Sequence, residues 1–165
     1  MNDAAFIIGL MRTETDAVGF IPAPAIRERW IPLGRYIIQR DRRGLRRGYI
    51  LHGPATARRP LYVNQCIIET DHRLRGYATL AVRTLLARAI SGQCTEIRLN
   101  CAADLSANAF WMTEGFTPIW IQTGGRRRDR QIITYQKKIP AHTHTISQAQ
   151  PQMLLPNFTR GDEHP

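Results

Sequence analysis

The residues of this chain best suited to chemistry lie in a short basic turn, Arg73-Leu74-Arg75-Gly76-Tyr77-Ala78. An apolar run ends before the turn at Ile68, and apolar residues with helical spacing follow it from Val82 to Ile90. The first backbone N–H groups of a helix lack an internal partner, and the helix dipole adds partial positive charge there. Because Gly76 has no Cβ, a phosphate can approach its backbone closely. The pattern favours an anion site between a strand and a helix, and a plain connecting turn is the alternative.

Two segments resemble motifs of the GNAT superfamily of acyl-CoA-dependent N-acyltransferases. Arg73-x-x-Gly76-x-Ala78 is similar to the Arg/Gln-x-x-Gly-x-Gly/Ala loop that holds the donor's diphosphate in that superfamily. Asn108-Ala-Phe-Trp-Met-Thr-Glu-Gly-Phe116 resembles its Asn-x-x-x-x-x-x-Gly-Phe segment, in which a helix ends at a glycine before a final hairpin. The resemblance spans roughly residues 16 to 139. It implies the family's fold, an α/β three-layer sandwich around a mixed, mostly antiparallel sheet.

By this resemblance the acyl donor is acetyl-CoA or a related thioester, bound as a substrate. The pantetheine arm of the donor would pair, like an added strand, with the backbone of Ile67, Ile68 and Glu69. Asn108 would hydrogen-bond to the same arm, and helix capping is the alternative role for its amide. The residues that would wrap the diphosphate through their backbone amides are Arg73, Leu74, Arg75, Gly76, Tyr77 and Ala78.

Acyl transfer to an amine needs a neutral amine and a proton for the departing thiolate. Many members of the superfamily supply that proton from a tyrosine four residues before the Gly-Phe pair, and this chain has Trp111 there. An indole cannot protonate a thiolate, so the sequence marks no standard acid. Substitute acids, none of them marked by a motif, are Tyr62, Tyr77, Tyr135, Cys101 and Ser106.

Three residues are candidates for the base that deprotonates the amine. Glu69 ends the central strand, where a carboxylate could act directly or through water, and Asp104 lies at the mouth of the next strand. His52 ends another strand and titrates near physiological pH. The alternative for Glu69 is a solvated charge, and for His52 a structural role. Cys101 as an acyl-carrying nucleophile would need a neighbouring base, which no nearby histidine supplies.

These side chains must be positioned by elements that periodicity and turn residues predict. Because a helix connects them, the strands at 61–68 and 96–101 should run parallel. Asp104 or Ser106 is placed to cap the helix that follows, and Gly115 to end it. The expected elements are a strand within 1–15, a short helix at 25–31, a hairpin of 35–40 with 47–52, the strand 61–68, the helix after the turn, the strand 96–101, a helix at 105–114 and a hairpin of 116–122 with 131–136.

Charge is the strongest compositional signal. Lys and Arg total 23 against 13 acidic residues, a net charge of +10, and arginines gather at Arg40–Arg47 and Arg126–Arg130. Arginine forks suit phosphate oxygens, so nucleic acid or another anion is an expected partner at these patches, with solvated hairpin tips as the alternative. Phage Mom-type DNA modification proteins are similar to GNATs, which makes nucleobase modification a further hypothesis.

Length and composition favour one domain, residues 1–139, followed by a disordered tail, residues 140–165. The 165 residues contain no run long enough to span a membrane and no basic secretory start. We therefore expect a cytoplasmic protein, in the host cytoplasm if it is phage-encoded. The three cysteines are scattered, so we expect reduced thiols and no metal site, with His142 and His144 solvated in the tail.

The leading hypothesis is an acyltransferase that moves an acetyl or related group from acyl-CoA to an amine of unknown identity. The rival is a non-catalytic domain of the same shape that binds nucleic acid or a protein. Trp111 favours the rival, and the intact loop at Arg73 favours the enzyme. The acceptor is expected to enter from the side of Phe20, Trp30, His52 and Trp120.

Overall fold

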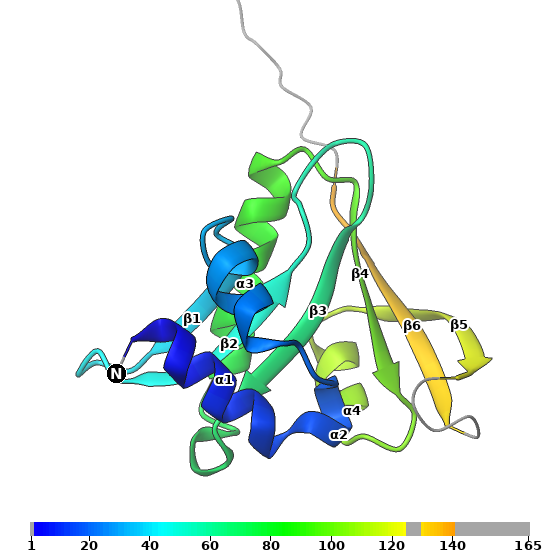
Figure 1. Ribbon diagram of the computed structural model, residues 1–165. Helices are drawn as coiled ribbons and strands as arrows, with labels where there is room; N and C mark the ends of the chain where they lie inside the picture. The colour runs from blue at the N-terminus through cyan, green and yellow to red at the C-terminus, as the bar shows by residue number, and fades with distance from the viewer. Residues whose placement is uncertain (1, 125–129, 141–165) are drawn as a thin grey trace, which may run out of the picture.

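The structure is a computed structural model and describes residues 2–124 and 130–140. The chain folds around a six-stranded sheet with the strand order β1-β2-β3-β4-β6-β5 (Figure 1). β3 and β4 run parallel, and the other neighbouring pairs are antiparallel. The expected mixed, mostly antiparallel sheet is therefore confirmed. In sheet order the strands are β1 (Tyr36–Arg40), β2 (Arg46–His52), β3 (Leu61–Ile68), β4 (Glu96–Ala102), β6 (Gln131–Lys138) and β5 (Thr117–Thr123).

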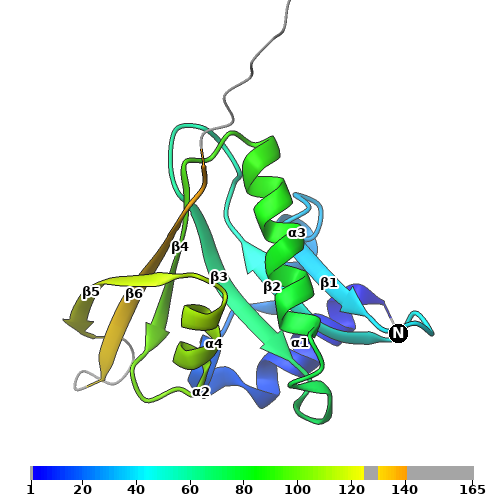
Figure 2. The same ribbon diagram turned by 180° about the vertical axis from the view of Figure 1, so that it is seen from behind.

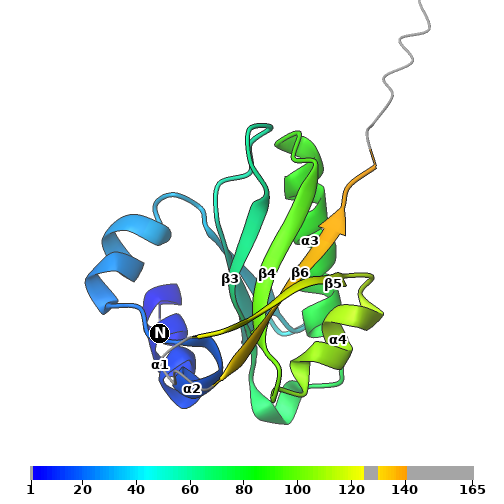
Figure 3. The same cartoon turned by 90° about the vertical axis from the view of Figure 1, so that its right-hand side faces the viewer.

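Helices cover both faces of the sheet and complete three layers. Figure 2 shows α3 (Tyr77–Ser91) and α4 (Ala107–Thr113) in front of the sheet. In Figure 3 these two helices lie on one side of β3 and β4, and α1 (Asp3–Thr13) and α2 (Thr15–Val18) lie on the other side. The π-helix η1 (Ala25–Trp30), where a short helix was expected, contributes Ile26 to the same core as α1. The α/β sandwich that the sequence predicted is confirmed.

The first element is a helix, so the strand expected within residues 1–15 was wrong. The side-chain oxygen of Asn2 caps α1 by accepting a hydrogen bond from the N–H of Ala5 at 2.9 Å. Ile7 and Met11 lie one turn apart and are buried against the sheet. The cap was readable in the sequence, but the run Phe6-Ile7-Ile8 is also typical of a buried strand.

The two helices on the far face follow the sequence more closely. α3 buries Val82, Leu85 and Ala89, which belong to the predicted apolar stripe. α4 is shorter than the predicted 105–114 and ends before Gly115, whose φ is +79°. Ser106, at the N-cap position, makes no side-chain cap bond, so that half of the capping prediction was wrong, and Asp104 pairs with Arg130.

β3 and β4 pair only near their beginnings. Their register runs from Leu61↔Ile97 to Val63↔Leu99, and beyond it the strands diverge toward the bottom of Figure 1. β3 is also irregular against β2, since Leu51 pairs with Gln65 and His52 with Val63. The extra residue between them, Asn64, forms a bulge, and bulges bend a strand. The bend therefore falls at the point where the two strands part.

Several sequence expectations concern residues outside 2–124 and 130–140. They are the tail beyond residue 140, including His142 and His144, and the arginine run before Arg130. Within the described ranges, no helix has the length and apolar character needed to cross a membrane.

Candidate functional site

A cavity of about 780 Å³ fills the opening between the diverging strands. Its walls come from the ends of β3 and β4, the turn before α3, the helix α4 and the junction of α1 with α2. Of the residues expected to bind the donor, Glu69, Arg75 and Asn108 do not line this cavity. Those that do line it are Ile67, Ile68, Arg73, Leu74, Gly76, Tyr77 and Ala78.

The turn before α3 has the geometry of an anion site. Gly76 occupies the N-cap position with φ +81°, and no side chain of the described residues caps the helix. The N–H groups of the first turn, at Tyr77, Ala78 and Thr79, therefore remain available to a ligand. A Cβ built on Gly76 would meet no atom within 4 Å, so the space in front of the helix is open. Together with the dipole of a 15-residue helix, this arrangement suits a diphosphate.

The register of β3 decides which of its main-chain groups face the cavity. The N–H of Glu69 donates to the carbonyl of Arg47 at 2.9 Å, so Glu69 and Ile67 direct their main-chain groups toward β2. Cys66 and Ile68 alternate with them and point to the opposite side, where β4 has moved away. An added strand would therefore pair with Cys66 and Ile68, whereas the sequence suggested the backbone of Ile67, Ile68 and Glu69.

Arg73 supplies positive charge at the mouth of the cavity. Its Nε donates to the carbonyl of Ile68 at 3.1 Å, and its Nη2 forms an ion pair with Glu14. Arg75 is exposed and does not line the cavity. Of the two arginines in this turn, only Arg73 therefore contributes its side chain to the cavity wall.

Two carboxylates at the cavity were missed by the sequence analysis. Glu14 lies between α1 and α2, and Glu114 follows α4. The hydroxyl of Thr79, in the first turn of α3, donates to Glu114 Oε1 at 2.5 Å. Both carboxylates therefore contact groups of the anion site, through Arg73 and Thr79. Glu14 lies outside both motifs, and Glu114 occupies a variable position of the Asn108–Phe116 segment, so neither pairing could be predicted from the sequence.

A buried amide anchors the other wall. Gln65 is 4% exposed, and its Nε2 donates to the carbonyls of Val18 and Gly19, both at 3.3 Å. Its Oε1 accepts from the hydroxyl of Tyr49 at 3.0 Å. This contact fastens the end of α2 over β3. Ala17 and Val18 of α2 line the cavity, whereas Phe20, Trp30 and Trp120, the expected acceptor side, do not.

Asn108 is occupied by the protein itself. Its Nδ2 donates to the carbonyls of Ala102 at 2.8 Å and Leu105 at 2.6 Å. Its Oδ1 accepts from the hydroxyl of Tyr135 at 3.0 Å. These bonds hold the connection between β4 and α4, which is closer to the structural alternative than to the expected contact with the pantetheine arm.

The acid candidates divide into two groups. Tyr77, Cys101 and Ser106 line the cavity, and Tyr62 and Tyr135 do not. Burial raises the pKa of Cys101 to about 11, so this thiol stays protonated at neutral pH and is a poor nucleophile. Burial likewise raises the pKa of the neighbouring Cys66 to about 12.

The carboxylate candidates for the base are held in ion pairs outside the cavity lining. Glu69 Oε2 lies 3.2 Å from Arg47 Nη1 and 3.4 Å from His72 Nδ1. Asp104 Oδ1 lies 2.9 Å from Arg130 Nε. His72, which the sequence analysis did not consider, does line the cavity.

His52 lies at the closed end of the paired strands, opposite Val63. It is 3% exposed, with Nδ1 2.7 Å from the carbonyl of Gly53 and Nε2 2.7 Å from Arg88 Nη1. Burial lowers the pKa of this imidazole below 6.5, and the nearby arginine charges lower it further. The structure does not bring His52 together with the other two base candidates.

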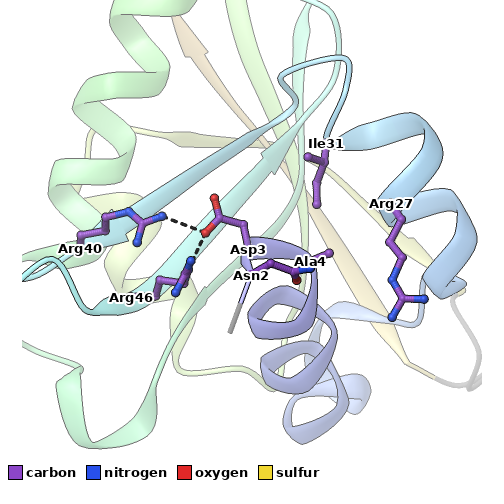
Figure 4. Close-up of a pocket in the computed structure, with 7 residues that line it drawn as sticks. All are labelled: Asn2, Asp3, Ala4, Arg27, Ile31, Arg40 and Arg46. Atoms are coloured by element: carbon purple, nitrogen blue, oxygen red, sulfur yellow. Dashed lines mark hydrogen bonds and ion pairs between the residues drawn. The ribbon is translucent and has the colours of Figure 1, made fainter.

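Much of the arginine cluster at 40–47 is neutralised within the chain. Asp3 Oδ1 accepts from Arg40 Nη2 at 2.8 Å and from Arg46 Nε at 2.5 Å (Figure 4). Burial opposes this charge, but the hydrogen bonds from Arg46 and Arg40 hold the pKa of Asp3 below 3.8. Arg47 pairs with Asp41 and Glu69. Three of the arginines that the sequence suggested for binding a polyanion, Arg40, Arg46 and Arg47, are therefore paired with carboxylates of the same chain.

A second cavity, of about 600 Å³, lies beside this cluster at the start of α1. Figure 4 shows Arg40 and Arg46 reaching the same carboxylate oxygen of Asp3, with Arg27 of η1 on the other side of the start of α1. Its remaining lining residues are Asn2, Ala4 and Ile31. Among residues 2–124 and 130–140, no group of His, Cys, Asp and Glu side chains could hold a metal ion.

No protein-family model and no curated protein sequence matches this chain. Solved structures share its fold. The crystal structure of Ard1 from Thermoplasma volcanium matches with a TM-score of 0.72 over 84% of this chain and 92% of that chain, at 14% identity. An aminoglycoside 6'-N-acetyltransferase complexed with coenzyme A matches with a TM-score of 0.70 over 83% and 91%, at 13% identity.

A GNAT-family acetyltransferase from Bacillus cereus also matches, with a TM-score of 0.63 over 82% of this chain and 90% of that chain, at 16% identity. The fold is therefore that of the GNAT acetyltransferases, and the resemblance read from the sequence is confirmed at this level. At such identities the likeness defines the architecture, and the chemistry must be argued from this chain's own residues.

Proposed function

We propose that the protein transfers an acetyl or related acyl group from acyl-CoA to an amine by direct attack. The observation that carries the proposal is the opening between β3 and β4, which leads to the uncapped N-terminus of α3. An acyl-CoA can use both features, a strand edge for its amide-containing arm and a positive helix terminus for its diphosphate. The aminoglycoside 6'-N-acetyltransferase of similar fold was crystallised in complex with coenzyme A.

In this proposal the amine nitrogen attacks the thioester carbonyl carbon, a C–N bond forms, and the C–S bond breaks as the tetrahedral intermediate collapses. The main-chain N–H of Cys66 or Ile68 would donate to the carbonyl oxygen as charge develops on it. The amine proton leaves through water to Glu69 or Asp104, since neither carboxylate lines the cavity. The departing thiolate takes a proton from water or from Tyr77.

Calorimetric titration with CoA tests the donor site. The variant Gly76→Glu should lose measurable CoA binding, because it places bulk and negative charge in front of the helix. Gly44→Glu is the matched control, since φ is +76° at Gly44 and +81° at Gly76, and an added Cβ meets no atom within 4 Å at either position. The donor assignment fails if wild type does not bind CoA, or if folded Gly76→Glu binds it as wild type does.

A second candidate is a non-catalytic domain that keeps the donor cavity. Trp111, 5% exposed at the position of the expected acid, favours this reading. Release of free thiol from acetyl-CoA, screened against amines, peptides and oligonucleotides, separates the two. Turnover with any acceptor supports the enzyme, and CoA binding without turnover across the screen supports the binding domain.

The acceptor could carry negative charge, and nucleic acid is the partner we propose to test first. Arg27 beside the second cavity favours it, as do the exposed Arg42 and Arg43 at the hairpin tip. Modification of a nucleobase, in the manner of Mom-type proteins, belongs to this proposal. Binding to an oligonucleotide should weaken steeply with salt, because released counterions drive it. Absent or salt-insensitive binding would remove this acceptor class.

A further inference from the structure

The arginine of the donor site is already bound to a carboxylate of the same chain. Arg73 Nη2 forms an ion pair with Glu14, while its Nε donates to the carbonyl of Ile68 at 3.1 Å. Both members of the pair line the cavity. Carboxylate and diphosphate oxygens use the same guanidinium donors, so Glu14 occupies a group that the donor needs.

Glu14 also belongs to the segment that covers the opposite side of the cavity. It directly precedes α2, a helix of only 4 residues with none of them buried. The backbone of that segment is held by Arg130 Nη1, which donates to the carbonyl of Asp16 at 2.8 Å, and by Gln65, which donates to that of Val18. Since α2 has little packing of its own, its position depends on such polar contacts.

We propose that Glu14 is an internal competitor of the donor, and that its displacement from Arg73 loosens α2 and opens the cavity to the amine. This inference rests on the proposed function, because it takes the diphosphate of acyl-CoA as the displacing ligand. The bond from Arg73 Nε to Ile68 keeps the guanidinium at the mouth, so Nη2 can exchange one anion for another without leaving the site.

The solvent exposure of the Arg73–Glu14 ion pair determines how strongly Glu14 competes with the donor for the guanidinium. The side chains of Arg73 and Glu14 are 46% and 23% exposed, so water screens the attraction between them. A pair of this kind is weak enough for a diphosphate with several charged oxygens to replace it. Removing the carboxylate should therefore change donor affinity by a modest factor, about two- to fivefold.

Calorimetry with CoA measures the competition. Glu14→Gln should bind CoA about two- to fivefold more tightly than wild type. Asp16→Asn is the matched control, because it removes the same charge from the same segment at an exposed residue that does not line the cavity, and it should leave the affinity unchanged. In an Arg73→Ala background, Glu14→Gln should no longer tighten binding, since the shared partner is gone.

Hydrogen exchange measures the coupling to α2. The N–H of Gly19 donates to the carbonyl of Thr15 at 2.9 Å, so its exchange reports whether α2 is formed and seated. CoA should accelerate this exchange in wild type, and Glu14→Gln should show the faster exchange without CoA. Glu14→Asp, which keeps the carboxylate, should behave more like wild type than Glu14→Gln does.

The outcomes separate this inference from the function on which it rests. If wild type binds CoA and Glu14→Gln binds it equally well, the internal competitor is refuted and the acyltransferase proposal stands. Slower or unchanged exchange at Gly19 on CoA addition refutes the coupling to α2. If neither wild type nor Glu14→Gln binds CoA, the inference and the proposed function fail together.

Discussion

At the scale of single residues, Trp111 sets a limit on the chemistry. Its ring packs against Phe110 at 5.0 Å and Phe116 at 5.3 Å between ring centroids, and the residue both belongs to the core and lines the cavity. The side chain is thus held firmly beside the space proposed for the thioester. An indole in that place can exclude water, but it cannot protonate a thiolate.

We therefore expect Trp111→Tyr to raise kcat for thiol release and Trp111→Phe to leave it within about threefold of wild type. A positioned general acid contributes roughly 10²–10⁴-fold, so even a poorly placed hydroxyl should be detectable as about a tenfold gain. Phe is the control because it makes a similar reduction in size without a hydroxyl. Steady-state kinetics on folded variants decides, and a tenfold loss in Trp111→Phe would give the indole a direct role in the reaction.

At the scale of elements, the close approach of β2 and β3 supports the edge that lines the cavity. Gly48 of β2 lies opposite Ile68, and a Cβ added there would come within 2.4 Å of the carbonyl oxygen of Ile67. No methyl group fits at that separation, so β3 would have to shift. Because Ile68 directs its main-chain groups into the cavity, the shift would be felt by the donor.

We predict that Gly48→Ala lowers the free energy of unfolding by roughly 1–3 kcal/mol and also weakens CoA binding. Gly53→Ala is the control directly after the same strand, since its added Cβ would lie 3.7 Å from the nearest atom, an ordinary contact. Urea denaturation and calorimetry measure the two effects. Equal stability and equal CoA affinity for both variants would contradict the proposed support of the β3 edge.

At the scale of the whole molecule, His52 couples stability to pH. It joins β2 to α3 through Arg88, and Arg35 Nη1 also reaches the carbonyl of Gly53 at 3.2 Å beside it. Burial lowers the pKa of the folded state below 6.5, so the unfolded chain takes up a proton first as the pH falls. The stabilising contribution is therefore complete above about pH 6.5 and is lost on acidification.

Urea denaturation of wild type and His52→Asn at pH 7.5 and pH 5.5 tests this sign. Wild type should lose more stability on acidification than the variant, by no more than about 1.4 kcal/mol per pH unit. The variant removes only the imidazole of His52. The difference between the two proteins in their loss of unfolding free energy therefore isolates His52 from the carboxylates and the other histidines. A steeper loss in the variant would contradict the structural role of a neutral His52.

The sequence predicted those parts of the molecule that local pattern determines. Strand 61–68, the glycine turn and the helix after it follow one another directly, so apolar spacing and Gly76 were enough to predict these elements and their order. The parallel pairing of β3 with β4 followed from the helix that joins them. The α1 helix was missed because Phe6-Ile7-Ile8 is compatible with a strand as well as with a helix.

The rest of the site depends on contacts between distant segments. Glu14 and Arg73 are 59 residues apart, and Thr79 and Glu114 are 35 apart, so no motif could join them. The role of Asn108 was also hidden, because its partners are main-chain carbonyls whose positions depend on how the β4–α4 connection folds. Which strand residues face the cavity required the register of β3 with β2.

The central claim is that the amides at the start of α3 and the free edge of β3 hold the donor. Titration of ¹⁵N-labelled protein with CoA tests it most directly, because each amide of this 18.8 kDa chain reports separately. The account predicts the largest shifts at Gly76, Tyr77, Ala78, Cys66 and Ile68, with those of the β1–β2 hairpin unchanged. The account would be contradicted if saturating CoA left the chemical shifts of these amides unchanged. It would also be contradicted if only the amides around the arginine-lined cavity at Asp3 shifted.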